Sequence, residues 1–255
     1  MSDMGKIVAK NILINPKKLS TVILKRKDIS GRLWLMWIEK PKEFSFKAGQ
    51  YCSIGTGNIE RPYSISSSPH EETLELFVEL VPPPEGNLTP LLWQLSVGDT
   101  VTIRPRAKGR FVFNPKLKNQ LMISTVTGIV PYVSILREYV HNDRNEHVFH
   151  VLQGVSYKSE FAYDGELTEL ASIYPDFIKY IATISRPNES ANAGWHGATG
   201  RVNDLIDDYI YHNSLSPEDT IIYACGHPQM IEIVKDKFIP QGFQIEQERF
   251  WKEDD

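Results

Sequence analysis

The stretch LMISTVTGIVPYVSILREYVHN, residues 121–142, decides the fold of the second half of this chain. Residues 121–125 are mainly apolar and predict a short buried strand, and residues 131–142 carry apolar side chains at helical spacing behind a proline. Gly128 lies in the turn between the two. A strand that passes through such a turn into a helix is the first half of a βαβ unit.

The same alternation continues toward the C-terminus. Apolar strands are predicted at residues 147–155, 177–184 and 221–226, and a helix at residues 228–242. Strands that alternate with helices indicate a parallel sheet with right-handed crossovers. We therefore expect a doubly wound, Rossmann-like α/β domain over residues 116–255.

Residues 1–115 have a different rhythm, because short segments rich in β-branched and aromatic residues alternate with turn residues. These segments predict strands at residues 6–14, 20–27, 32–39, 50–55, 74–81 and 100–105. One helix is predicted at residues 87–95, which offer polar caps and an early proline. Regularly spaced short strands favour an antiparallel β-barrel, and residues 114–120 form the natural boundary between the two domains.

The composition limits the classes of function. The chain has 255 residues, of which 41% are hydrophobic and 24% charged, as in a globular protein. A net charge of −4 gives no case for nucleic-acid binding. Cys52 and Cys225 are too few and too far apart for a disulfide framework, a zinc site or an iron–sulfur cluster. Without an apolar leader or an apolar run of ~18 residues, we expect a cytoplasmic protein with no membrane partner. We also expect a monomer without a bound metal.

The stretch RPYSISSSP, residues 61–69, places an aromatic ring between an arginine and a row of hydroxyls. Arg61 can neutralise a diphosphate, the ring of Tyr63 can stack on a planar group, and Ser64 can donate and accept hydrogen bonds. The alternative is an ordinary edge strand, where proline is tolerated. We interpret the trailing serines as a turn into the next strand.

Several later turns also suit a phosphorylated ligand. Residues 86–90 supply a glycine and a threonine hydroxyl before a predicted helix. The turns at residues 124–131 and 225–230 follow strands of the α/β domain, and ligands bind beyond the carboxyl ends of such strands. Arg186 and Arg201 can converge there and bind a ribose phosphate. The alternatives are structural turns and solvated surface arginines.

The chain carries in order the motifs RPYS (61–64), GNLTP (86–90), TGIVPYVSIL (127–136), SR (185–186), TGR (199–201), CGHPQM (225–230) and RFW (249–251). In this order they resemble the ferredoxin–NADP⁺ reductase family, most of all its bacterial subclass, over nearly the whole chain. The resemblance implies an FAD-binding barrel and an NADP(H)-binding α/β domain. It also implies a reductase that exchanges electrons between NADP(H) and a separate one-electron carrier protein, ferredoxin or flavodoxin.

The resemblance implies roles for residues on the flavin side. Arg61 meets the FAD diphosphate, Tyr63 packs on the isoalloxazine, and Ser64 hydrogen-bonds near flavin N5. Phe250 covers the isoalloxazine and Trp251 the adenine of FAD. The other FAD contacts that it implies are Pro62, Phe77, Asn87, Leu88, Thr89 and Thr127.

On the nucleotide side, the resemblance implies that Ser185, Arg186 and Arg201 hold the 2′-phosphate of NADP(H), with Cys225 beside the nicotinamide. The other NADP(H) contacts that it implies are Gly128, Gly226 and Met230. The catalytic residues that it implies are Ser64, Cys225 and Glu248.

The chain departs from the family pattern at three places. Val126 stands where relatives have the first glycine of a glycine–threonine–glycine turn, and Ser156 where they often have arginine. Four residues, KEDD, follow Trp251. Ser156 favours an alternative function, an NADH-preferring flavin reductase or oxygenase reductase component. Val126 favours another, an FAD-binding regulatory or scaffold subunit with poor hydride exchange.

Overall fold

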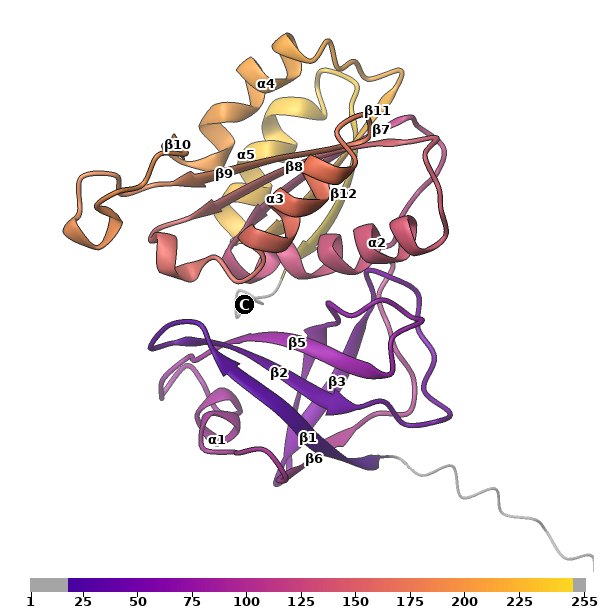
Figure 1. Ribbon diagram of the computed structural model, residues 1–255, viewed down its shortest axis with the longest axis vertical. Helices are drawn as coiled ribbons and strands as arrows, with labels where there is room; N and C mark the ends of the chain where they lie inside the picture. Colours follow the sequence, from indigo (N-terminus) through magenta and orange to yellow (C-terminus); the bar gives the residue numbers. More distant parts are fainter. Residues whose placement is uncertain (1–17, 250–255) are drawn as a thin grey trace, which may run out of the picture.

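A computed structural model of the chain describes residues 18–249, which form two domains (Figure 1). An antiparallel barrel lies against a parallel sheet that is flanked by helices. The expected order, a β-barrel followed by a doubly wound α/β domain, is therefore confirmed. The strand predicted at residues 6–14 and the flavin contacts predicted for Phe250 and Trp251 lie outside the described residues.

The barrel sheet has the strand order β4-β3-β6-β1-β2-β5. Its elements are β1 Leu19–Asp28, β2 Leu33–Glu39, β3 Tyr51–Thr56, β4 Ile59–Ser64, β5 Thr73–Glu79, α1 Thr89–Trp93 and β6 Thr100–Ile103. The Ser66 N–H donates to the Glu75 carbonyl (2.9 Å), so the sheet nearly closes between β4 and β5. On β2, Trp34 and Met36 fill the barrel, whereas Leu35 faces a core shared with the other domain.

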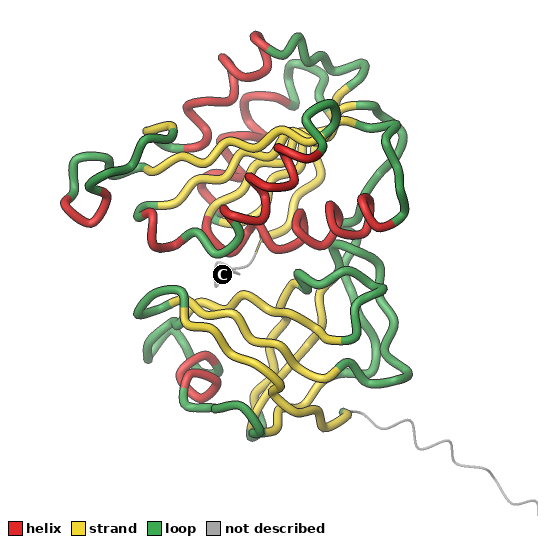
Figure 2. Tube along the Cα trace, viewed as in Figure 1, coloured by secondary structure: helices red, strands yellow, loops and turns green. Residues whose placement is uncertain are grey.

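The parallel sheet has the strand order β10-β9-β8-β7-β11-β12. Figure 2 shows its strands side by side with helices around them. Its strands are β7 Asn119–Thr125, β8 Val148–Val155, β9 Ile178–Ile184, β10 Ala198–Thr199, β11 Thr220–Gly226 and β12 Gln244–Arg249. Its helices are α2 Val130–His141, α3 Asp164–Ile173, α4 Ile206–His212 and α5 Pro228–Phe238, with short 3-10 helices η1 Val126–Ile129, η2 Lys158–Glu160, η3 Ser190–Asn192 and η4 Val202–Leu205.

The central strands of this sheet are buried on both faces, and their side chains alternate between two apolar layers. Met122 and Tyr223 pack in the core that contains α2, α3 and part of the barrel. Leu121 and Ile222 pack in the core that contains α4 and α5. The first of these cores is continuous between the domains, so it holds the barrel against one face of the α/β domain.

The structure confirms the predicted strands and helices of the α/β domain and adds α3, α4, β10 and β12. Strand β12 was missed because its sequence QIEQER has no apolar alternation. It forms the last strand of the sheet and pairs with β11, with Glu248 opposite Cys225. An unpredicted strand therefore carries one of the predicted catalytic residues.

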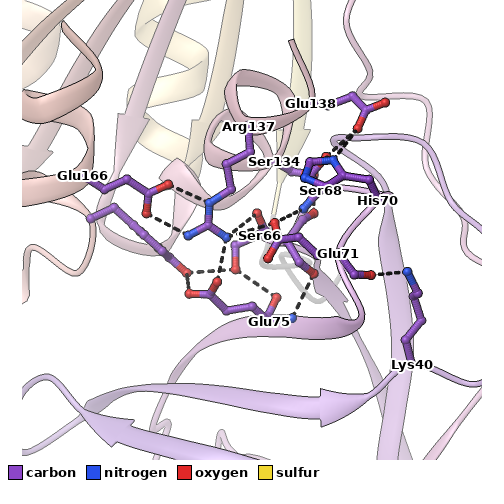
Figure 3. A network of polar contacts seen from close by, with 12 residues as sticks. Lys40, Ser66, Ser68, His70, Glu71, Glu75, Ser134, Arg137, Glu138 and Glu166 are labelled. Carbon is purple, nitrogen blue, oxygen red and sulfur yellow. Dashed lines mark hydrogen bonds and ion pairs between the residues drawn. The ribbon is translucent and has the colours of Figure 1, made fainter. Parts of the chain in front are cut away.

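A partly buried polar network joins the domains (Figure 3). Arg137 of α2 forms a bidentate ion pair with Glu166 of α3 (2.6 and 2.7 Å) and a 2.7 Å hydrogen bond to Glu75 of β5. The Tyr163 hydroxyl lies 2.9 Å from Ser66 Oγ and 3.0 Å from the Glu75 carboxylate. Burial alone would lower the pKa of the Arg137 guanidinium. The hydrogen bonds and ion pairs with Glu166 and Glu75 together have a larger effect and raise this pKa.

Ser66, Ser67 and Ser68 lie in the connection between β4 and β5, as expected of a turn into the next strand, and they also belong to this network. All three are fully buried. The Ser67 carbonyl accepts a 2.7 Å hydrogen bond from the Ser134 hydroxyl of α2, and Ser68 Oγ donates to Glu138 of the same helix. The segment that follows the RPYS motif therefore fixes the α/β domain directly beside that motif.

Candidate functional site

The first pocket encloses about 590 Å³ and is lined by residues of both domains. It is called the flavin-side pocket because most of its lining residues are those predicted to contact flavin. Strand β4 and the loop after β5 form most of it, and Thr127 and Val130 close it from the α/β domain. Because β4 is an outer strand of the barrel sheet, the RPYS motif is both an edge strand and a pocket wall. The predicted flavin contacts that line this pocket are Arg61, Pro62, Tyr63, Ser64, Phe77, Asn87, Leu88, Thr89 and Thr127.

The lining of the flavin-side pocket combines an exposed cation with aromatic side chains. The Arg61 side chain is exposed, whereas the Tyr63 ring packs on the barrel core, and burial raises the pKa of its hydroxyl. Phe77 is 4% exposed and meets Tyr163 edge to face. Such a lining suits a ligand that has both a planar apolar part and an anionic part.

The loop of residues 81–89 is closed at its base. Thr89 Oγ1 accepts a hydrogen bond from the Val81 N–H (2.9 Å) and donates one to the Val81 carbonyl (3.0 Å). A Cβ at Gly86 would lie 1.7 Å from that carbonyl oxygen, so only glycine fits. The Thr89 hydroxyl, which was predicted to bind phosphate, therefore already forms hydrogen bonds within the loop. The loop presents Asn87 to the pocket.

Ser64 and Glu248 meet where the domains adjoin. The Ser64 hydroxyl donates a 3.2 Å hydrogen bond to the Glu248 carboxylate. Burial, offset in part by this hydrogen bond, raises the pKa of Glu248 to about 7. A carboxyl group with that pKa exchanges its proton near neutral pH, so this pair can supply or accept a proton at the flavin-side pocket.

The second pocket, here the nucleotide-side pocket, encloses about 370 Å³ beyond the carboxyl ends of β7, β8 and β9. The predicted NADP(H) contacts that it brings together are Ser185, Arg186, Arg201 and Met230. Ser156, Asn203 and His227 also line it. The last two were not predicted, because an asparagine and a histidine after a turn carry no specific signal in one sequence. Two arginines beyond parallel strands suit a phosphate.

Gly128, Cys225 and Gly226 line neither pocket, so their direct contact with the nucleotide stays a prediction. A Cβ at Gly128 would lie 2.1 Å from the Cys225 carbonyl oxygen, and one at Gly226, where φ is +126°, would lie 2.3 Å from Thr125 Oγ1. These glycines let the ends of β7 and β11 pack closely. Cys225 is fully buried, and burial together with Glu248 raises the pKa of its thiol, which therefore stays protonated.

The turn between β7 and α2 separates the two pockets. Thr125 and Val126 line the nucleotide-side pocket, whereas Thr127 lines the flavin-side pocket. Val126 has φ 43°, a left-handed conformation that glycine adopts far more easily than a β-branched residue. The two candidate sites therefore lie on either side of one short turn, and the valine in this turn is strained.

Comparison with known proteins shows which family the chain belongs to. Residues 122–236 match the family model of the oxidoreductase NAD-binding domain. A ferredoxin–NADP reductase from Pseudomonas aeruginosa is 32% identical over 200 residues, which cover 73% of this chain and 76% of the relative. This chain belongs to the ferredoxin–NADP reductase family.

Other members of the family match over a larger part of the chain. A flavodoxin/ferredoxin–NADP reductase from Buchnera aphidicola is 28% identical over 254 residues, which cover 91% of this chain and 98% of the relative. The solved structure of a Neisseria gonorrhoeae ferredoxin–NADP⁺ reductase with bound FAD and NADP superposes with a TM-score of 0.78 at 25% identity. That match covers 92% of this chain and 99% of the other, so the family resemblance extends across both domains.

Among residues 18–249, no helix is long and apolar enough to cross a membrane. Within the same range, no group of three or more His, Cys, Asp and Glu side chains is arranged to hold a metal ion.

Proposed function

We propose that this protein is an FAD-dependent reductase that exchanges electrons between NADP(H) and a one-electron carrier protein, a ferredoxin or a flavodoxin. The observation that carries the proposal is the pair of pockets on either side of one turn, with Val126 lining one and Thr127 the other. Two cofactors that must exchange a hydride need adjoining sites of this kind. We propose that residues 1–115 form the FAD-binding domain and residues 116–255 the NADP(H)-binding domain.

The residues of the flavin-side pocket fit FAD. We assign the diphosphate to the exposed Arg61 guanidinium and to the backbone of Asn87 and Leu88 in the closed loop. Tyr63 supplies a ring that packs beside the isoalloxazine, and Ser64 supplies a hydroxyl at the junction with the α/β domain. When bound, FAD accepts two electrons as a hydride and passes them on singly.

The residues of the nucleotide-side pocket fit NADP(H). We assign the 2′-phosphate to Ser185, Arg186 and Arg201, which lie beyond the carboxyl end of β9. The turn that holds Thr125 and Val126 would orient the nicotinamide, and the shared apolar core holds the two domains together beside it. Ser64 and Glu248 then hold a proton at the flavin side, because the Glu248 carboxyl titrates near neutral pH.

For the carrier protein we propose a docking face formed by the exposed side chains of Arg106, Lys108 and Arg110. This segment adjoins the proton-holding pair, since a Cβ at Gly109 would lie 3.5 Å from Glu248 Oε1. A basic face beside the flavin attracts an acidic one-electron carrier and orients it for transfer. We propose that the reductase works as a monomer in the cytoplasm.

Two alternatives make different use of the same pockets. Ser156 in the nucleotide-side pocket favours an NADH-preferring flavin reductase or oxygenase reductase component, because a phosphate partner is missing there. The strained Val126 favours a regulatory or scaffold flavoprotein with poor hydride exchange.

Steady-state turnover with NADPH and NADH, measured for the wild type, Arg186→Ala and Arg201→Ala, tests the function. A reductase of NADP(H) loses about tenfold or more in kcat/KM for NADPH in each variant and little for NADH. Equal losses of kcat/KM for NADPH and NADH would show that these arginines do not recognise the 2′-phosphate. Protein that binds FAD but turns over neither nucleotide would support the scaffold alternative.

A further inference from the structure

At the rim of the nucleotide-side pocket, the acidic side chain of Glu189 is already paired with Arg186. Glu189 Oε1 lies 3.3 Å from Arg186 Nη1, and Glu189 Oε2 accepts a 2.7 Å hydrogen bond from the Tyr157 hydroxyl. The same hydroxyl accepts a 2.9 Å hydrogen bond from Arg186 Nη1, and the guanidinium lies 5.3 Å from the Tyr157 ring centroid. The three side chains therefore satisfy one another in a closed triangle.

The backbone around this triangle is held firmly. Asn192, which is 2% exposed, donates hydrogen bonds to the carbonyls of Ser156 (2.9 Å) and Arg186 (2.8 Å) and accepts one from the Lys158 N–H (2.8 Å). These bonds tie the loop after β9 to the end of β8. The fold thus holds the backbone of Arg186 in place near that of Glu189.

The side chains of the triangle remain free to change partners. The Arg186 side chain is 52% exposed and that of Glu189 is 48% exposed. An exposed ion pair contributes only about 0–1 kcal/mol, so a ligand with more charge can displace the carboxylate from the arginine. Arg186 lines the pocket beside Ser156, and this serine has no positive charge that could bind a phosphate in place of the arginine.

We propose that Glu189 is a specificity-determining residue that competes with the 2′-phosphate of NADPH for Arg186 and Tyr157, and so weakens the preference for NADPH over NADH. This inference rests on the proposed function, because it assigns the 2′-phosphate to Arg186. A phosphate must break both contacts of Glu189 and then lie near its negative charge. The ribose 2′-hydroxyl of NADH can instead donate to the carboxylate, which is how acidic residues favour NADH in dinucleotide-binding folds.

The test is isothermal titration calorimetry of the full-length, FAD-loaded protein with 2′,5′-ADP and with 5′-AMP, which differ only in the phosphate. In Glu189→Gln we expect 2′,5′-ADP to bind about fivefold more tightly, with the affinity for 5′-AMP unchanged. In Glu189→Asp, which keeps the charge, the affinity ratio of the two ligands should stay within about twofold of the wild type. Turnover should agree, with a lower KM for NADPH in Glu189→Gln at unchanged kcat.

A matched control is Glu218→Gln, which makes the same charge change at an exposed residue before the amino end of β11, whereas the nucleotide-side pocket lies at the carboxyl ends of the strands. An unchanged affinity ratio in Glu189→Gln, or equal tightening of both ligands, would overturn the inference while leaving the proposed function intact. A wild-type protein that binds both ligands equally, with no effect of Arg186→Ala, would instead overturn the assigned 2′-phosphate site itself.

Discussion

The Ser64 hydroxyl donates a 3.2 Å hydrogen bond to the Glu248 carboxylate, although the two residues are 184 positions apart in the chain. Ser64 ends the outer strand of the barrel, and Glu248 lies on the last strand of the parallel sheet. The bond therefore forms only when both domains are folded and docked. It gives the junction of the domains one group that titrates near neutral pH.

Removing the serine hydroxyl should move this titration upward. The hydrogen bond from Ser64 lowers the pKa of Glu248, against the larger effect of burial that raises it to about 7. In Ser64→Ala only burial remains, so we expect the pKa of Glu248 to rise above that of the wild type. A pH titration followed by carboxyl-carbon NMR measures this directly, and a lower pKa in Ser64→Ala would contradict the assigned bond.

The same shift should appear in the pH dependence of stability. The pKa of Glu248 rises from its ordinary value of 4.5 to about 7 on folding, so the folded state binds the proton more tightly. Its contribution to stability is complete below pH 4.5 and is lost as the pH rises to about 7. In Glu248→Gln that dependence disappears. Urea unfolding at several pH values should show the wild-type free energy falling by up to about 1 kcal/mol per pH unit relative to the variant; parallel curves would contradict the account.

Arg137 should be among the most costly side chains to remove. Arg137→Met leaves Glu75, whose side chain is only 4% exposed, without its cation. Breaking a buried pair in this way costs about 3–5 kcal/mol of unfolding free energy. The exposed pair of Lys237 and Asp207 is a matched control, since Lys237→Met should cost less than about 1 kcal/mol. Adding Glu75→Gln to Arg137→Met should recover part of the loss, and a fully additive double variant would argue against direct coupling.

Charge reversal at the proposed docking face should affect the carrier alone. In Arg106→Glu with Lys108→Glu, we expect the KM for a reduced or oxidised ferredoxin to rise about tenfold at low ionic strength. NADPH oxidation by a small uncharged quinone should stay at the wild-type rate, because an uncharged acceptor is not attracted by the docking face. Lys116→Glu with Lys118→Glu reverses two exposed charges next to β7 and serves as the control. Equal effects of the two pairs would place the docking face elsewhere.

The sequence predicts most of the fold because both domains follow simple periodicities. Strand β7 and helix α2 differ clearly in the spacing of their apolar residues, and β2 combines aromatic and branched residues. Strand β12 shows no such pattern, because it is half-exposed at the edge of the sheet and is held by backbone pairing with β11. Edge elements of this kind depend on the neighbouring strand more than on their own residues.

The candidate site was predictable where a local motif carries the chemistry, as in Arg61 to Ser64. It was not predictable where distant residues must meet. The role of Ser66 to Ser68 depends on Arg137, Glu138 and Ser134 of another domain. Likewise, the triangle around Arg186 depends on a loop that folds back onto the preceding strand end, and spacing along the chain does not encode that contact.

The central claim is that a hydride passes between the cofactors bound in the two pockets, across the turn at Val126 and Thr127. Anaerobic stopped-flow absorbance tests this claim most directly. The FAD-loaded protein is mixed with NADPH in the absence of oxygen and of any carrier protein. The account predicts that the visible flavin absorbance bleaches at a rate that saturates with NADPH concentration and is slower in Arg186→Ala at low NADPH. Flavin that binds to the protein yet keeps its absorbance with both NADPH and NADH would contradict the account.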